Sequence, residues 1–179
     1  MPNFTKIDLL RCFLRFSRNI GRQELARSLE LGEGTSRTML EILKSKKLLD
    51  STKKGHFLSK KGSDALAKLQ SCISMPKSIG SNSIYPGLKK AGVVIREASS
   101  LRELYRLRDI AVKNGAEGAI ILKFRGKFYA PESDYIQDYR ELEAHFSMKS
   151  NDVLVIAFSG SGKNAETGAL AIAIELSDE

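Results

Sequence analysis

The chain has 179 residues, of which 42% are hydrophobic and 28% charged, and it carries a formal net charge of +8. This length suits one or two globular domains, and no apolar run is long enough to span a membrane, so we expect no membrane contact. We also find no signal-peptide pattern and no metal-ligand motif around His56 or His145, which predicts a cytoplasmic protein without a metal or other cofactor.

Charge is distributed unevenly along the chain. Residues 1–75 contain 15 Lys and Arg against 7 Asp and Glu, whereas residues 76–179 contain 14 of each kind. The whole excess of positive charge therefore lies in the first segment. A basic excess gathered on one small domain is typical of polyanion binding. The sequence thus indicates a nucleic-acid-binding domain at 1–75, joined to an electrically neutral second domain.

Residues 5–18 are predicted to form the first helix. At about 100° per residue, the apolar side chains cover roughly 220° of its circumference, against the ~100° stripe typical of a helix with one buried face. Such a helix needs cover on two sides, either from a partner subunit, which would make the protein a homodimer, or from a large local core. Cys12 in this helix and Cys72 further along are interpreted as core thiols rather than a redox switch.

A second helix is predicted at 22–29 and a third at 35–46, with Thr35 or a near neighbour as its cap. The intervening segment contains two glycines, which supply the turn. The apolar residues of the third helix cluster on one face and its polar residues on the other. Such a polar row is what a recognition helix presents to the major groove. The candidate DNA contacts on this helix are Thr35, Arg37, Thr38, Glu41 and Lys44.

Two interpretations of these charged residues stay open. Arg37 either contacts DNA or lies on a solvated helix face. Glu41 either accepts a hydrogen bond from a cytosine amino group or pairs with Arg37 or Lys44 at helical spacing.

Residues 48–51 and 56–59 are predicted to be short strands that are joined by a turn in which Gly55 can adopt a positive φ. A basic hairpin directly after a recognition helix is a wing. Lys53 and Lys54 at its tip are expected to contact phosphate, which positions the protein without specifying sequence. A fourth helix is predicted at about 60–74.

The stretch LARSLELGEGTSRTMLEILKSKKLLDSTKKGHFLSKKGSDAL resembles the winged helix-turn-helix domains of bacterial and archaeal transcriptional regulators. The matching features are the Leu25/Ala26 pair, the helix TSRTMLEIL, the step into the wing at 47–49 and the closing helix. The resemblance covers about the first 70 residues, and it implies double-stranded DNA as the partner. Because winged helices also dock other molecules, the alternative function is an adaptor that binds protein or RNA without sequence-specific DNA binding.

Residues 76–91 contain two prolines and two glycines, which predicts a linker. Residues 92–179 are predicted to form an α/β sandwich of βαββαβ order, the split-βαβ or ferredoxin-like pattern, so the fold class is α+β. A capping box at Ser100–Glu103 marks the first helix start. The tail at 165–176 alternates like a strand but is rich in alanine, and we favour a helix. The other elements are strands at 93–96, 118–124, 127–130 and 152–158 and helices at 100–114 and 135–147.

Two features of the second domain could bind a small anionic effector. Arg108 falls in the apolar arc of its helix, where a charge needs a partner. That partner is either an internal carboxylate or an anionic ligand held bidentately in a cleft. A glycine-serine loop after the buried strand either presents backbone N–H groups to an anion or is a surface loop. It lacks the Walker A pattern, and its residues are Ser159, Gly160, Ser161, Gly162 and Lys163.

The run RDIAVKNGAEGA, with the flanking hairpin and the alanine-rich tail, resembles an uncharacterised archaeal family that joins a winged helix to a C-terminal domain of unknown function. That resemblance supports two domains but supplies no chemistry. No nucleophile–base set or carboxylate pair is recognisable, so we expect no enzyme. The sequence predicts a DNA-binding transcriptional regulator whose second domain senses a small molecule or forms a dimer.

Overall fold

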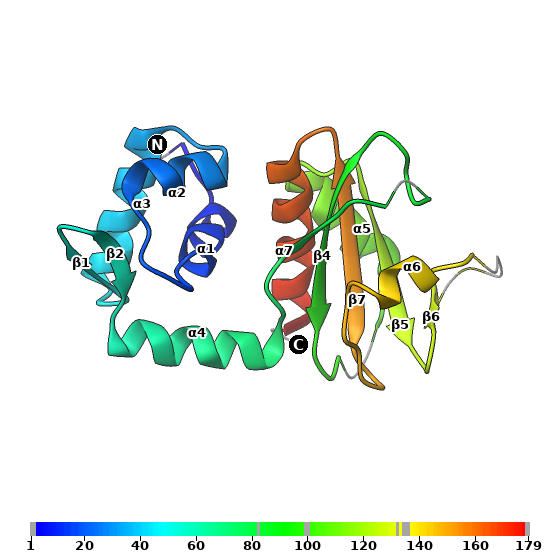
Figure 1. The fold of residues 1–179 in the computed structure, drawn as a ribbon. Helices are drawn as coiled ribbons and strands as arrows, with labels where there is room; N and C mark the ends of the chain where they lie inside the picture. The colour runs from blue at the N-terminus through cyan, green and yellow to red at the C-terminus, as the bar shows by residue number, and fades with distance from the viewer. Residues whose placement is uncertain (1–2, 82, 99–100, 132, 134–136, 178–179) are drawn as a thin grey trace. The chain divides into compact units, whose positions relative to one another are not determined.

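The computed structural model describes residues 3–81, 83–98, 101–131, 133 and 137–177. The chain divides into two compact units, residues 1–70 and 71–179, which we describe separately (Figure 1). The first is mainly helical and the second contains a five-stranded antiparallel sheet with helices, so the α+β class is confirmed. None of the described helices is long and apolar enough to cross a bilayer.

The first unit has the element order of a winged helix. Ile20, between the first two helices, exchanges two backbone hydrogen bonds of 3.0 Å with His56. This isolated β-bridge places Ile20 beside the second strand of the hairpin. The hairpin itself is antiparallel. The elements are α1 (Lys6–Leu14), α2 (Arg22–Leu29), α3 (Glu33–Ser45), β1 (Leu49–Thr52), β2 (Gly55–Leu58) and α4 (Lys60–Cys72), whose last residues belong to the second unit.

The second half of the wide apolar arc of α1 is buried by the chain itself, whereas Ile7, Leu9 and Leu10 are half-buried. Cys12, Leu14 and Phe16 are each at most 2% exposed. The Arg11 side chain is also buried, where it pairs with Asp8 at 3.3 Å and donates to the Leu29 carbonyl oxygen at 3.2 Å. The arc of α1 therefore does not by itself require a second subunit, and the homodimer stays a prediction.

Two local details of the first unit differ from the sequence predictions. α3 begins two residues earlier than expected, with Gly32 rather than Thr35 at its N-cap. The turn is short because Glu30, in a left-handed conformation, ends α2 and Gly32 already caps α3. Cys72 is exposed rather than in the core, since it lies off the helix stripe that carries Leu66 and Ile73.

In the second unit, the predicted order strand–helix–strand–strand–helix–strand is present from β4 to β7. β4 and β5 run parallel to each other with β7 between them and antiparallel to both, which is a split βαβ unit. The described elements are β3 (Lys77–Ile79), β4 (Lys89–Ile95), α5 (Leu104–Lys113), β5 (Gly118–Phe124), β6 (Phe128–Tyr129), α6 (Arg140–Glu143), β7 (Val153–Ser159) and α7 (Gly162–Ser177).

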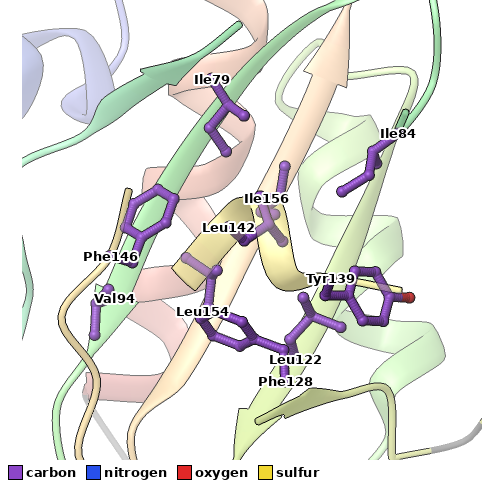
Figure 2. Packing of buried hydrophobic residues seen from close by; sticks show 10 residues of the cluster. All are labelled: Ile79, Ile84, Val94, Leu122, Phe128, Tyr139, Leu142, Phe146, Leu154 and Ile156. Carbon is purple, nitrogen blue, oxygen red and sulfur yellow. The ribbon is translucent and has the colours of Figure 1, made fainter. Parts of the chain in front are cut away.

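Both faces of this sheet are covered. α6 and its flanking segments lie over one face, and α5 and α7 lie behind the other (Figure 2). On the first face, Leu142 and Phe146 pack with strand residues such as Leu154. Phe146 can approach closely because a Cβ on Gly92 would lie only 2.4 Å from its ring.

The segment 76–91 is not a free linker. It contains β3 and the start of β4, which pair with each other, and Tyr85 stacks on the Phe158 ring at a centroid distance of 3.8 Å. Pro76 precedes β3, and Gly80, Pro86 and Gly87 lie in the connection that returns the chain from β3 to β4. Short strands of this kind form through pairing with a partner, which composition does not reveal.

The helices of the second unit also differ from the predictions. Within the described residues α5 begins at Leu104, with Glu103 at its N-cap, and Ser100 of the predicted capping box lies outside the described residues. The helix predicted at 135–147 is reduced in the described part to α6, and residues 135–136 lie outside the description. The tail forms α7, which confirms the favoured helix.

An alanine at Gly62, in the first turn of α4, would place its Cβ 2.0 Å from the backbone carbonyl oxygen of Leu48. Helix and hairpin would have to shift, so we expect Gly62→Ala to lower the free energy of unfolding by about 1–3 kcal/mol. In the control Gly34→Ala, nothing lies within 4 Å of the added Cβ, and helix propensity should raise stability by up to about 1 kcal/mol. Urea denaturation measures both, and equal effects would contradict the close contact.

Burial raises the pKa of the Cys12 thiol to about 12, whereas Cys72 is exposed. Because the thiolate is the reactive form, we expect a thiol reagent at pH 8 to modify Cys72 rapidly and Cys12 only after unfolding. Counting the reacted thiols with and without urea measures this. In a Cys72→Ser variant, rapid modification of the folded protein would show that Cys12 is accessible after all.

Candidate nucleic-acid interface

One face of α3 is anchored and the opposite face is open to solvent. Ser36, Met39 and Leu43 are buried in the core of the first unit. On the other side Arg37, Thr38 and Glu41 are exposed, while Thr35 and Lys44 are half-buried. The helix therefore presents the polar row that its sequence predicts.

Arg37 and Glu41 pair with each other on this open face. The Arg37 Nε donates to a Glu41 carboxylate oxygen at 3.2 Å, and the two side chains are 67% and 65% exposed. A pair this exposed contributes roughly 0.3–0.5 kcal/mol. Each side chain can therefore leave this pair and bind another partner at a small cost in free energy.

The hairpin is joined to α3 by a side-chain hydrogen bond. Lys53 and Lys54 form its exposed tip, and the Lys54 N–H donates to the Thr52 hydroxyl at 3.2 Å. The Lys44 ammonium donates to the Ser51 hydroxyl at 2.8 Å, which ties the end of α3 to β1. The wing lysines and the α3 row thus belong to one connected surface of the first unit.

A cavity of about 440 Å³ beside α2 adds basic groups that the sequence reasoning missed. It is lined by Arg22, Arg27 and His56 and by one carboxylate, that of Glu24, which pairs with Arg18. It lies at the N-terminus of α2, where Gly21 supplies no side-chain cap. Unpaired N–H groups at a helix start, together with basic side chains, suit a phosphate. Gly21 and Arg22 at the start of α2 are the only sequence signal for this site. His56 reaches it through the folding of the hairpin, and the sequence does not reveal this proximity.

The surroundings of His56 disfavour its protonation. Burial, Lys44 and Arg22 each lower the pKa of its imidazole below the ordinary value. Within the described part of the chain, the buried His56 Nδ1 has no hydrogen-bond partner. A phosphate anion beside the imidazole would raise its pKa again, because an opposite charge favours the protonated form.

Not all basic residues of the first unit are available to a ligand. Arg11 is buried in its pair with Asp8, and Arg18 pairs with Glu24 at the surface. The exposed remainder includes the hairpin tip and, among others, Lys46, Lys47, Lys60 and Lys61.

The loop at 159–163 in the second unit already uses much of its anion-binding capacity on the chain's own oxygens. The Gly160 N–H donates to a Glu117 carboxylate oxygen at 2.7 Å, so a carboxylate of the protein occupies the place of an anion. The Ser161 hydroxyl accepts from the Asn164 N–H at 3.4 Å and caps α7. Ser159 is buried, and Gly162 and Lys163 are half-buried in the first turn of α7.

Arg108 and this loop are not brought together. Arg106 pairs with Glu175 at 2.5 Å, whereas Gly115 lies against Asn164, so α5 and α7 run antiparallel. Arg108 lies roughly 10 Å along α5 from the end that faces the loop. It is half-buried and already takes part in an interaction within the chain.

Among the described residues, no group of three or more His, Cys, Asp and Glu side chains is placed to hold a metal ion.

Comparisons with known proteins match both units. The family described as "PH0730-like, N-terminal domain" matches residues 7–64, and the family described as "Domain of unknown function (DUF4443)" matches residues 86–176. A similar solved structure is the hypothetical protein PH0730 from Pyrococcus horikoshii OT3, with 28% sequence identity and a TM-score of 0.85. The similarity covers 98% of this chain and 94% of that one. No curated protein matches the chain.

Lowering the pH should destabilise the protein through His56. Its folded-state pKa lies below the unfolded value of about 6.5, so the unfolded chain binds more protons between the two values. The stabilising contribution is present above about pH 6.5 and is lost as the pH falls. The difference in unfolding free energy between the wild type and His56→Gln should shrink from pH 7.5 to 5, measured by urea denaturation. An NMR titration that places His56 at or above its ordinary pKa would contradict this.

Proposed function

The chain belongs to the DUF4443 family, a family of unknown function, and from that premise we propose that it is a DNA-binding transcriptional regulator. The observation that supports the proposal most is the open face of α3 beside a lysine-tipped hairpin, in the unit that holds the whole positive excess of the chain. Basic charge gathered around an exposed helix is the electrostatic pattern of a DNA-reading surface.

In this proposal α3 enters the major groove. Arg37 donates to the acceptor edge of a guanine, and Glu41 accepts from a cytosine amino group, once their mutual pair opens. Thr38, whose hydroxyl donates to the Gly34 carbonyl oxygen at 3.2 Å, rotates to a base or phosphate. These contacts would determine which sequence is bound.

The surrounding basic groups hold the phosphate backbone. Lys53 and Lys54 contact one strand from the wing, Lys44 adds a charge at the end of α3, and the cavity at the start of α2 takes a further phosphate. About four such contacts predict a log–log dependence of affinity on salt with a slope of roughly −3 to −4.

The proposal extends to the assembly and to the second unit. Regulators that read DNA through one small domain commonly act as homodimers on paired half-sites. The neutral second unit would supply the dimer contact or bind a small anionic effector, without enzymatic activity. For such an effector to regulate, it must bind two arrangements of the protein with different affinity.

A second candidate function is an adaptor that docks protein or structured RNA through the same face. The observation that favours it is Glu41, which neutralises Arg37 in the middle of the row.

Fluorescence anisotropy with a random duplex of about 20 base pairs tests the DNA proposal. We expect binding that weakens steeply with salt, and a Lys53→Ala/Lys54→Ala variant that binds about tenfold more weakly, because two phosphate contacts are lost. The matched control, Lys113→Ala/Lys127→Ala, removes the same charge from exposed sites of the second unit and should bind like the wild type.

No binding at low salt, or an affinity indifferent to salt, would refute DNA binding. Equal losses of affinity in the two double variants would show that binding depends on the net charge of the protein rather than on contacts from the wing. If Arg37→Ala and Lys54→Ala both leave duplex binding intact but disrupt a protein or RNA complex, the adaptor function is correct.

A further inference from the structure

A larger cavity, of about 730 Å³, lies at one end of the sheet in the second unit. Ile95 and Lys123 both pair with Val153, so the ends of β4 and β5 and the start of β7 lie together at this end (Figure 1). The volume falls within the roughly 300–1,000 Å³ of small-molecule sites. The side chains that matter for its chemistry are Glu97, Lys123, Arg125, Tyr129 and Asn151.

The charge of the cavity favours an anion. Lys123 and Arg125 line it together with one carboxylate, that of Glu97. Within the residues that the structure describes, neither cation takes part in an ion pair, although Lys123 is half-buried. Two cations against one carboxylate leave the cavity with an excess of positive charge, and an anionic ligand would supply the balancing charge.

The cavity also offers flat aromatic surface. Tyr129 is half-buried and lines it, and the Arg125 guanidinium lies 5.7 Å from the Tyr129 ring centroid. The Phe124 ring packs against Phe128 in the core of the other face. Aromatic faces and a stacked guanidinium bind planar rings well. A ligand that joins a ring to an anionic group would use both features at once.

Two of the three segments that line the cavity are held together by a buried carboxylate, and the third is the β5–β6 hairpin. Asp152, which is 1% exposed, accepts from Arg96 at 2.5 Å, from the Glu97 N–H at 3.3 Å and from the Lys149 N–H at 2.9 Å. The loop from β4 and the loop before β7 are thereby joined. A cavity whose walls are fixed in advance binds a ligand at a smaller entropic cost.

We propose that this cavity binds a small anion that carries a planar aromatic ring, such as an aromatic carboxylate or a nucleoside monophosphate. Lys123 and Arg125 hold the anionic group, the ring of Tyr129 contacts the ligand ring, and the Asn151 amide hydrogen-bonds to its polar atoms. The site lies at the opposite end of the sheet from the 159–163 loop, since Ser159 pairs with Lys89. It does not depend on DNA binding by the first unit.

Isothermal titration of the full chain, without DNA, tests the site with adenosine and uridine monophosphate, benzoate and inorganic phosphate. We expect at least one ring-bearing anion to bind about tenfold more tightly than phosphate, and the nucleotide and benzoate arms identify which class it is. Arg125→Ala and Lys123→Ala should each weaken binding about tenfold. Lys127→Ala, in the same hairpin but outside the cavity, should leave the affinity unchanged.

Glu97→Gln should tighten binding, because it removes the cavity's own carboxylate, and a gain of affinity cannot arise from misfolding. In ¹⁵N spectra the ligand should shift the amides of 123–125, 129 and 150–151. The proposal is wrong if no ring-bearing anion binds at about 10 mM, if Lys127→Ala weakens binding as much as Arg125→Ala, or if the shifted amides lie at 159–163. If the chain binds these probes but no duplex, only the DNA proposal is refuted. If it binds a duplex but none of these probes, only the cavity proposal is refuted.

Discussion

Strand β7 (Val153–Ser159) is buried along its whole length and hydrogen-bonded to β4 on one side and to β5 on the other. It lies between two strands that precede it in the chain, so the central pairs of the sheet join distant segments rather than neighbouring hairpins. Both loops of chemical interest lie at its ends: Asp152 before it organises the cavity, and Ser159 after it opens the loop that caps α7. The geometry of both sites therefore depends on the pairing register of one strand.

Elements formed by local signals could be predicted from the sequence, and elements formed by distant partners could not. α2 and the β1–β2 hairpin follow from a periodic pattern and a glycine turn. β3 has three residues, and it forms by pairing with β4. α7 was ambiguous because residues 165–173 are all buried, so no polar face revealed the helical period. Tyr139, Leu142 and Phe146 have helical spacing and are buried, yet only one turn of helix forms between them.

The candidate sites follow the same division. The α3 row could be predicted because its residues share one helix face, and spacing alone places them together. The cavity at α2 could not, since His56 arrives from β2 through its backbone bonds to Ile20. Arg108 takes part in an interaction within the chain, and spacing could not show that the 159–163 loop lies at the far end of its helix. The cavity with Arg125 draws on three separate segments, none of which carries a motif.

The two ends of β7 are not equivalent with respect to the rest of the chain. The chain enters the second unit through the last turn of α4, where the Cys72 carbonyl oxygen accepts from the Arg96 N–H at 2.7 Å. Arg96 also pairs with Asp152 and precedes Glu97, a wall of the cavity. Glu97 is thus bonded directly to the residue that holds the last residue of α4. The 159–163 loop is separated from Cys72 by the seven residues of β7, roughly 20 Å. The cavity and the point where the chain enters the second unit therefore lie at the same end of the sheet, and the pair of Arg96 with Asp152 organises both.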